Sequence, residues 1–251
     1  MRLLALTGAL LLTSAAAQAA PRTWHFTCDY YNLDLKGHLT GRQRFSALYT
    51  RGLADNMVRW GDVTVANGNS WDDKFGAPQK QGFMEGFTYA YGDIAGMMKS
   101  EFFHGFPESA IQQRNLVWDT HMLEGFVNDF DKLKPNVAYH VPDSGDMQLA
   151  GAGTFHNRDL QLTLTGTTKR NGRDCAVMDY RAMFNTLDTK LPGIELIGRS
   201  DFWGQIWVGP DRQIEYATLY EEVIGELTFT NQQKPMNIAV VRVGVFEPVG
   251  Q

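Results

Sequence analysis

Acidic and histidine side chains are the residues of this chain whose types and spacing could support chemistry. His121 and Glu124 lie three residues apart in a segment with helical periodicity, so a helix would place both on one face. They could supply two ligands to a metal ion, but one helical turn rarely forms a metal site alone, and a solvated helix face explains the same spacing. Asp72 and Asp73 lie in a loop flanked by aromatic residues, where they could bind a cation or form a turn held by Asx hydrogen bonds. We therefore expect neither a metal ion nor a cofactor.

Sequence signatures of several large enzyme classes are missing from the chain. It contains no G-x-S-x-G nucleophile motif, no Walker A loop, no H-E-x-x-H zinc motif and no EF-hand loop. A hydrolase that uses acidic residues such as Asp72, Asp73 or Glu85 would leave little trace in a sequence, and it stays an alternative. The sequence favours a protein without catalytic activity.

Aromatic residues alternate with other side chains along the segment 201–208. In an extended strand Trp203, Gln205 and Trp207 would share one face. The opposite face would carry Phe202, Ile206 and Val208. Antiparallel strands usually leave one face polar, so a strand with two apolar faces must be covered on both. Either both faces belong to a plain hydrophobic core, or one lines a groove that admits an apolar ligand.

The two cysteines of the chain, Cys28 and Cys175, bear on the compartment in which the protein works. Outside the cytoplasm two cysteines are more often paired than free, so we predict a Cys28–Cys175 disulfide. The alternative is two separate buried thiols. Neither residue belongs to a C-x-x-C motif, so redox catalysis is not expected.

The N-terminal residues have the pattern of a secretory signal peptide. Arg2 is followed by an apolar and small-residue run from Leu3 to Ala17, and Ala17-Gln18-Ala19 forms a small-x-small cleavage site. The run is too short for a stable membrane anchor. We expect residues 1–19 to be removed and the mature protein, residues 20–251, to be a single periplasmic or secreted α+β domain.

The composition of the chain excludes some classes of partner for the mature domain. The chain has a formal net charge of −5, with 43% hydrophobic and 20% charged residues, which is typical of a globular protein. It offers no basic stripe for nucleic acid. After residue 20 no apolar run is long enough to span a membrane as a helix.

Residues that alternate in hydrophobicity predict strands in both halves of the chain. The predicted strands cover 23–31, a segment that follows a turn at 32–34 and runs to about 49, and the segments 57–66, 160–165, 173–184, 198–208, 213–219 and 238–246. A phase shift at Gly61 indicates a β-bulge. Asn171-Gly172 predicts a type I′ hairpin turn between two of the later strands.

Helical periodicity is confined to the middle of the chain. An apolar stripe predicts one long helix at about 109–133, with a capping-box pattern at Ser109–Gln112 and a stop at Pro135. Apolar residues between 94 and 106 also recur at helical spacing and predict a shorter helix. The long helix should pack against the sheet.

Residues 171–217 resemble the second half of LolA-like periplasmic lipoprotein carriers. The likeness rests on the hairpin at Asn171-Gly172, the strand 204–208, the turn at 209–212 and the strand 213–217. It is a rhythm of strands and turns and includes no diagnostic side chains. This chain departs from the family in its length, its glycine- and aromatic-rich N-terminal half and its central helix. The resemblance implies an unclosed antiparallel sheet with helices on its concave side, and it implies acyl-chain carriage.

These observations combine into one prediction of fold and function. We expect an α+β fold, a curved and mostly antiparallel half-barrel-like sheet with one long and one short helix packed on it. We expect a carrier or sensor of a lipophilic small molecule or lipid. The predicted ligand surface lies between the long helix and the strand 198–208, with the residues Trp118, Met122, Phe126, Trp203 and Trp207. The alternatives are a secreted hydrolase and an envelope interaction module without a small ligand.

Overall fold

The computed structural model describes residues 20–72, 74–142, 145–231 and 234–250. They form one antiparallel sheet of 13 strands, with the order β4-β3-β2-β1-β13-β12-β11-β10-β8-β7 along its main path. β5 pairs with β3, β9 pairs with β10, and β6 pairs with β9. The strands are β1 (Arg22–Leu33), β2 (Leu39–Arg51), β3 (Met57–Gly68), β4 (Gln79–Lys80), β5 (Thr88–Ala90), β6 (Tyr139–His140), β7 (Asp146–Gln148), β8 (Gly153–His156), β9 (Leu160–Arg170), β10 (Arg173–Leu191), β11 (Ile194–Val208), β12 (Ile214–Phe229) and β13 (Met236–Pro248).

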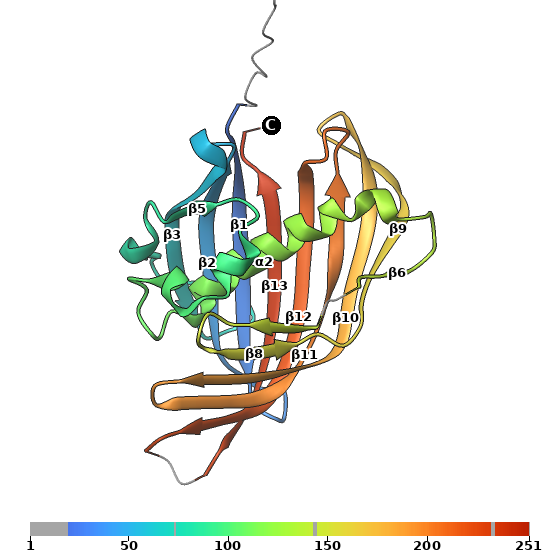
Figure 1. Ribbon diagram of the computed structural model, residues 1–251. Coiled ribbons are helices and arrows are strands. Elements are labelled where there is room, and N and C mark those ends of the chain that lie inside the picture. The colour runs from blue at the N-terminus through green and yellow to red at the C-terminus, as the bar shows by residue number, and fades with distance from the viewer. Residues whose placement is uncertain (1–19, 73, 143–144, 232–233, 251) are drawn as a thin grey trace, which may run out of the picture.

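The sheet is curved and unclosed, as the sequence predicted. Its main path ends at β4 on one side and at β7 on the other, and within the described residues these two strands do not pair with each other. The first and last long strands are neighbours, because β1 pairs with β13 from Trp24 to Leu33. Figure 1 shows this central pair with the long strands β10–β12 on one side and β2 and β3 on the other.

Hydrophobic alternation and turn chemistry account for the long strands. In β1, Trp24, Phe26, Cys28 and Tyr30 face the core, as the period of two predicted. Asn171 and Gly172 both have positive φ angles and join β9 to β10, in agreement with the predicted hairpin. The predicted bulge at Gly61 is confirmed by a register shift between β2 and β3 at this point.

The helix α2 (Ile111–Asn128) lies diagonally across the concave face of the sheet (Figure 1). It is shorter than the predicted 109–133. The predicted capping box at Ser109 is wrong, because the amide of Ala110 bonds to Pro107 O in a turn and the helix begins only after Ala110. At the other end the chain leaves α2 through a 3-10 turn, η4 (Phe130–Lys132).

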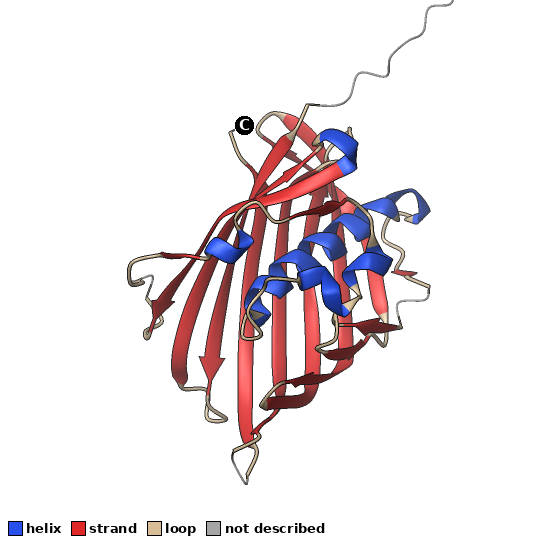
Figure 2. Cartoon of the chain, turned by 60° about the vertical axis from the view of Figure 1, so that its left-hand side comes forward, coloured by secondary structure: helices blue, strands red, loops and turns tan. Residues whose placement is uncertain are grey.

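Further short helical segments lie on the same side of the sheet as α2 (Figure 2). They are α1 (Ile94–Met97) and the 3-10 turns η2 (Gly82–Met84) and η3 (Ser100–Phe103); another turn, η1 (Ala54–Asn56), precedes β3. Their aromatic side chains cover part of α2, since the ring of Phe103 meets that of Trp118 edge-on at 5.4 Å. Every residue of α2 from 111 to 127 is therefore buried or half-buried.

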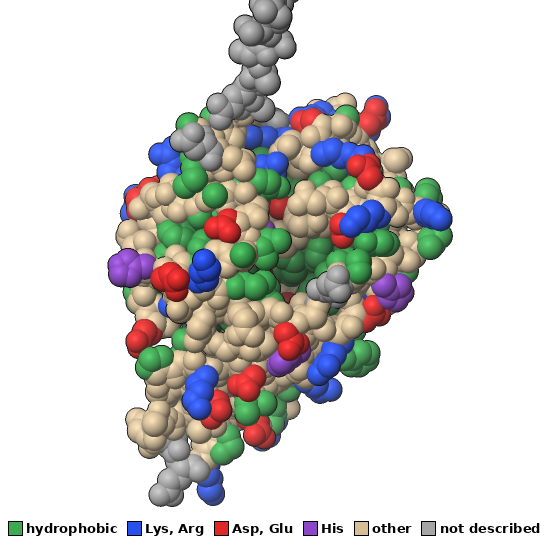
Figure 3. All heavy atoms as spheres, in the orientation of Figure 1, with side chains coloured by type: hydrophobic (Ala, Val, Ile, Leu, Met, Phe, Trp, Pro, Cys, Tyr) green, Lys and Arg blue, Asp and Glu red, His purple; other side chains and the backbone are tan. Residues whose placement is uncertain are grey.

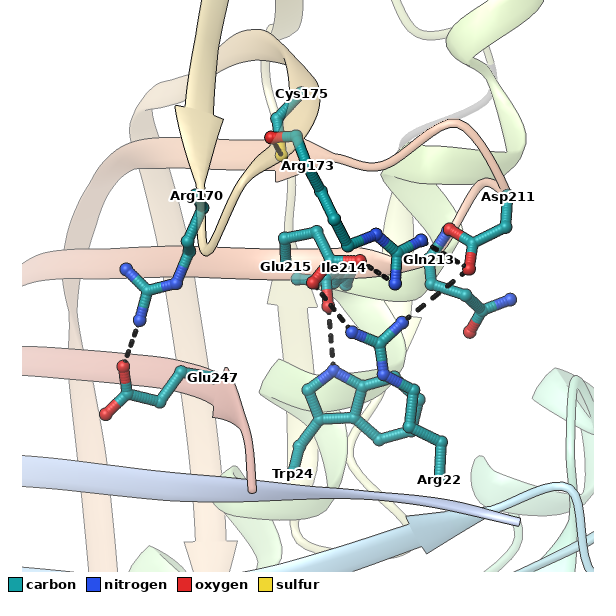
Figure 4. A network of polar contacts seen from close by, with 10 residues as sticks. All are labelled: Arg22, Trp24, Arg170, Arg173, Cys175, Asp211, Gln213, Ile214, Glu215 and Glu247. Carbon is teal, nitrogen blue, oxygen red and sulfur yellow. Dashed lines mark hydrogen bonds and ion pairs between the residues drawn. The ribbon is translucent and has the colours of Figure 1, made fainter. Parts of the chain in front are cut away.

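The predicted Cys28–Cys175 disulfide is wrong, because both cysteines are free and buried. Cys28 lies in β1 and Cys175 in β10, and the strands β13, β12 and β11 lie between them. Four steps of about 4.8 Å between strands exceed the Cα separation that a disulfide can bridge. Cys175 lies beside Arg173, whose carbonyl oxygen accepts a hydrogen bond from its thiol at 3.6 Å (Figure 4).

No helix among the described residues is long and apolar enough to cross a membrane. The predicted signal peptide, residues 1–19, lies outside the described residues.

Candidate functional site

The five predicted ligand-binding residues lie on opposite faces of the sheet. Phe202 of β11 is only 5% exposed and faces α2, whereas its neighbour Trp203 is 42% exposed and faces away. The ring of Phe126 contacts Tyr180 at 5.0 Å, and Tyr180 in turn contacts Phe202 at 6.3 Å. The helix therefore packs on the Phe202 face. The single surface predicted between the helix and the two tryptophans Trp203 and Trp207 is not formed.

The inner face, which carries α2, holds three of the predicted residues. Phe126 is buried, and Trp118 and Met122 are half-buried against the hydrophobic core. Half-buried apolar residues from other segments pack against the same core, among them Val141 and Phe155. Figure 3 shows a hollow near the middle of this face, next to α2, in which hydrophobic side chains gather.

A buried ionic cluster joins α2 to the sheet beneath it. Arg242 of β13 forms ion pairs with Asp119 of α2 and with Glu221 of β12. Ser200 donates a hydrogen bond to Glu221 at 2.5 Å, and the Arg242 guanidinium lies 5.0 Å from the ring centre of Tyr30. Burial raises the pKa of Asp119 to about 7, although Arg242 opposes the shift. One arginine cannot neutralise two buried carboxylates, so below about pH 7 a proton on Asp119 balances the charge.

A second buried carboxyl, Glu124, lines a small pocket near the C-terminal end of α2. The pocket has a volume of about 250 Å³ and is also lined by Arg51, Tyr91, Asp131 and Arg212. Burial raises the pKa of Glu124 to about 7, against the effect of Arg51, whose guanidinium lies 3.3 Å away. The hydroxyl of Tyr49 donates to its carboxylate at 3.0 Å. Glu124 is thus poised to exchange a proton near neutral pH.

The solvated helix face that would explain the His121–Glu124 spacing is not observed. Glu124 is buried, and burial lowers the pKa of the half-buried His121. Among the described residues no three metal-ligating side chains come together. The other acidic candidates are exposed: Ser70 lowers the pKa of Asp72, and Glu85 accepts a hydrogen bond from the amide of Asp62 at 3.1 Å. Asp73 lies outside the described residues.

The outer face of the sheet, opposite α2, carries a trough of about 1090 Å³ across β9–β12. We call this the outer trough. Two aromatic pairs line it, each formed by residues directly opposite on β11 and β12. Trp203 lies against Tyr220 with ring centres 6.0 Å apart, and Trp207 lies against Tyr216 at 5.0 Å. The sequence prediction was right that Trp203 and Trp207 share a face.

Polar side chains fill the space between and beside the aromatic pairs of the outer trough. Gln205 donates a hydrogen bond to Asp179 at 2.9 Å and receives one at 3.5 Å from the indole of Trp207. Arg181 donates to Gln161 at 2.8 and 3.1 Å. At one end Arg170 lies over Tyr216 and pairs with Glu247, as Figure 4 shows for the ion pair. These contacts hold the polar groups of the trough in fixed orientations.

Comparison with known proteins assigns this chain to no family. No family model matches it, and no curated protein matches it. Among solved structures it is similar to lipovitellin, from work on lipid–protein interactions, at 12% identity and a TM-score of 0.39 over 91% of this chain. The chain spans 25% of that lipovitellin chain.

Two bacterial structures show a weaker likeness over most of both chains. One is a DUF1329 family protein from Desulfovibrio piger, at 6% identity and a TM-score of 0.16, which covers 93% of this chain and 88% of the other. The other is an AttH-like protein from Nitrosomonas europaea, at 9% identity and a TM-score of 0.18, which covers 88% and 92%. At these TM-scores the likenesses assign no activity, and the function has to be argued from the two faces of the sheet.

Proposed function

We propose that this protein is an exported, non-catalytic carrier or sensor of a lipophilic ligand, which it holds on the inner face beside α2. Residues 1–19 would direct export, and residues 20–251 would act as one domain. The resemblance of residues 171–217 to LolA-like carriers supports this proposal, and so does the unclosed sheet with a helix on its concave side.

The observation that carries the proposal is the hydrophobic hollow on the inner face (Figure 3). Apolar side chains left in contact with water are costly, and a hollow lined by them is a typical site for an apolar ligand. Because the sheet is unclosed, a ligand can reach its concave face from the side without the helix having to unfold. An acyl chain or another flexible apolar group would fit such an opening.

The helix contributes adaptable side chains to this surface. Met122 has three rotatable bonds and a polarisable sulfur, so it can repack around ligands of different shape. Trp118 is also half-buried, whereas the buried Phe126 contacts Tyr180 and anchors the helix to the sheet. We therefore assign Met122 and Trp118 to ligand contact and Phe126 to the support of the site.

The experiment is a binding titration with a fluorescent long-chain fatty acid, together with native mass spectrometry for copurified lipid. Met122→Glu places a charge on the inner face and should weaken binding at least about tenfold, because an apolar ligand cannot solvate it. Met236→Glu is the matched control, since Met236 is 48% exposed at the start of β13. The proposal is wrong if the wild type binds neither lipid nor the fluorescent fatty acid. It is also wrong if Met122→Glu and Met236→Glu bind the fluorescent fatty acid equally well.

Glu124 favours a second candidate function, that of an enzyme with a carboxylic acid as proton donor. A buried carboxyl with a pKa of about 7 in a small polar pocket meets the first requirement of general acid catalysis. A screen of ester and glycoside substrates with the wild type and Glu124→Gln tests it. Turnover that Glu124→Gln abolishes, with the fold retained, would establish this function in place of a carrier.

A further inference from the structure

We propose that the outer trough is a binding site for a neutral oligosaccharide chain. The trough is independent of the inner face, because the sheet lies between them and the helix contacts only the inner side. It therefore adds a second ligand to the proposed function and does not depend on the first.

The exposure of the aromatic residues is the first argument for a ligand in the outer trough. Trp203 is 42% and Tyr220 is 38% exposed, although both are large apolar rings in the middle of a sheet. The planes of the two rings are inclined by only 15°, and the rings stack on each other. This contact holds both rings in place before any ligand binds. Exposed and ordered aromatic rings are typical of binding surfaces.

The spacing of the aromatic pairs indicates an elongated ligand. Trp203 and Trp207 are four residues apart on the same face of β11, which corresponds to about 13 Å along the strand. That span is longer than one sugar ring. Gln205 and Thr218 lie between the two pairs, and the Gln205 amide is held by Asp179. The trough thus presents, in one line, an exposed aromatic pair, a polar site and a second, half-buried aromatic pair over which the Arg170 guanidinium lies.

This alternation matches the chemistry of sugars. A sugar ring has C–H groups that pack on an aromatic face and hydroxyl groups that both donate and accept hydrogen bonds. Amides and carboxylates such as Gln161, Gln205 and Asp179 offer the complementary donors and acceptors. Each of these side chains has at least one partner within the trough, and a purely apolar chain in the same place would remove water from their remaining donors and acceptors without replacing it.

The charges of the outer trough favour a neutral ligand. Arg170 is paired with Glu247, and the remaining charged groups that line the trough are Arg181 and Asp179. Two positive and two negative groups cancel. The trough therefore lacks the excess of cations that nucleic acids or acidic polymers would require.

The test is calorimetric titration of the full mature protein with neutral hexasaccharides of β-1,4-linked glucose, β-1,4-linked N-acetylglucosamine and α-1,4-linked glucose, and with the corresponding disaccharides. We expect at least one hexasaccharide to bind, and its disaccharide to bind at least about tenfold more weakly, because the shorter chain reaches only one aromatic pair. An acidic hexasaccharide of galacturonic acid should not bind more tightly than the neutral ones.

Substitutions then locate the site. Trp203→Ala should weaken hexasaccharide binding at least about tenfold, or about 1.4 kcal/mol, while Trp203→Phe should retain most of it. Trp71→Ala is the control, because Trp71 is 61% exposed but stacks on Tyr31 outside the trough. Circular dichroism checks that each variant is folded. The proposal is overturned if no neutral hexasaccharide binds the folded wild type, if only the acidic one binds, or if Trp203→Ala and Trp71→Ala bind alike.

Discussion

Replacement of Asp119 by Asn should remove about half of the pH dependence of stability that this fold carries between pH 5 and pH 8. Burial raises the pKa of Asp119 to about 7 from an ordinary value of 3.8. The folded protein therefore keeps a proton on this carboxyl over a pH range in which the unfolded chain has lost it. Because the folded state binds more protons, stability falls as the pH rises from about 4 to about 7.

The size of the effect follows from the two pKa values. For Asp119 the contribution at pH 5 exceeds that at pH 8 by about 2.6 kcal/mol, when each pKa unit is worth 1.36 kcal/mol. Glu124, whose pKa is also raised to about 7, adds a contribution of about 2.5 kcal/mol with the same sign. The half-buried His121 has a lowered pKa and works in the opposite direction, since its neutral form is favoured in the fold.

Asn is the right substitution because it has the shape and the neutral charge of protonated aspartic acid. It leaves the ion pair between Arg242 and Glu221 in place, and one positive and one negative group then balance each other. The free energy of unfolding, measured in urea at pH 5 and pH 8, gives the pH effect for the wild type and the variant. When the pH effect of the variant is subtracted from that of the wild type, the contributions of Glu124 and His121 cancel, because both proteins contain these residues.

We expect Asp119→Asn to be close to the wild type at pH 5 and to lose less stability at pH 8, with a slope reduced by about 2.6 kcal/mol over this range. Glu124→Gln should reduce the slope by a similar amount, and the double variant should keep only the opposite slope that His121 contributes. An unchanged slope in Asp119→Asn would mean that this carboxyl is already ionised in the fold at pH 5, and the charge assignment of the buried cluster would be wrong.

Further predictions concern export, the cysteines and the packing of the sheet. Intact mass of exported protein should show a chain that begins at Ala20. Thiol titration of unfolded, unreduced protein should give two free thiols, from Cys28 and Cys175. Gly204→Ala should destabilise the protein by about 2 kcal/mol or more, because its Cβ would lie 2.0 Å from Thr218 O and 2.7 Å from the Tyr180 hydroxyl. Equal denaturation midpoints for Gly204→Ala and the wild type would contradict this packing.

The strands and their turns could be predicted from the sequence because their signals are local. Alternation in β1 and the Asn171-Gly172 turn each depend on a few neighbouring residues, and both are confirmed. The ends of α2 were less accurate, because the turns on either side continue the helical spacing of apolar residues without continuing the α-helix. The disulfide was wrong because compartment and cysteine count say nothing about the distance between two strands.

The candidate sites depend on information that periodicity does not contain. Alternation shows that Trp203 and Trp207 share a face, but it does not show which face the helix covers. The polar residues of the same face were the available signal, since Gln205 and Thr218 lie between the aromatic rings while Phe202, Ile206 and Val208 face the core without a polar residue among them. Asp119 was missed, and Glu124 was considered only as a metal ligand or a solvated residue, for a related reason. They lie in an amphipathic pattern whose polar side was interpreted as solvated, although the sheet and the segment 82–106 leave α2 almost no solvated side.

The two faces of the sheet thus use aromatic residues in different ways. On the inner face, rings such as Phe126, Tyr180 and Phe202 contact one another and hold the helix in place, so their loss should appear first as a loss of stability. On the outer face, Trp203 and Tyr220 remain exposed and contribute little to the core, so their loss should appear first as a loss of binding. We expect Trp203→Ala to weaken oligosaccharide binding at unchanged stability, and Phe126→Ala to lower stability at unchanged oligosaccharide binding. That result would place the oligosaccharide site on the outer face and assign Phe126 to the support of the helix.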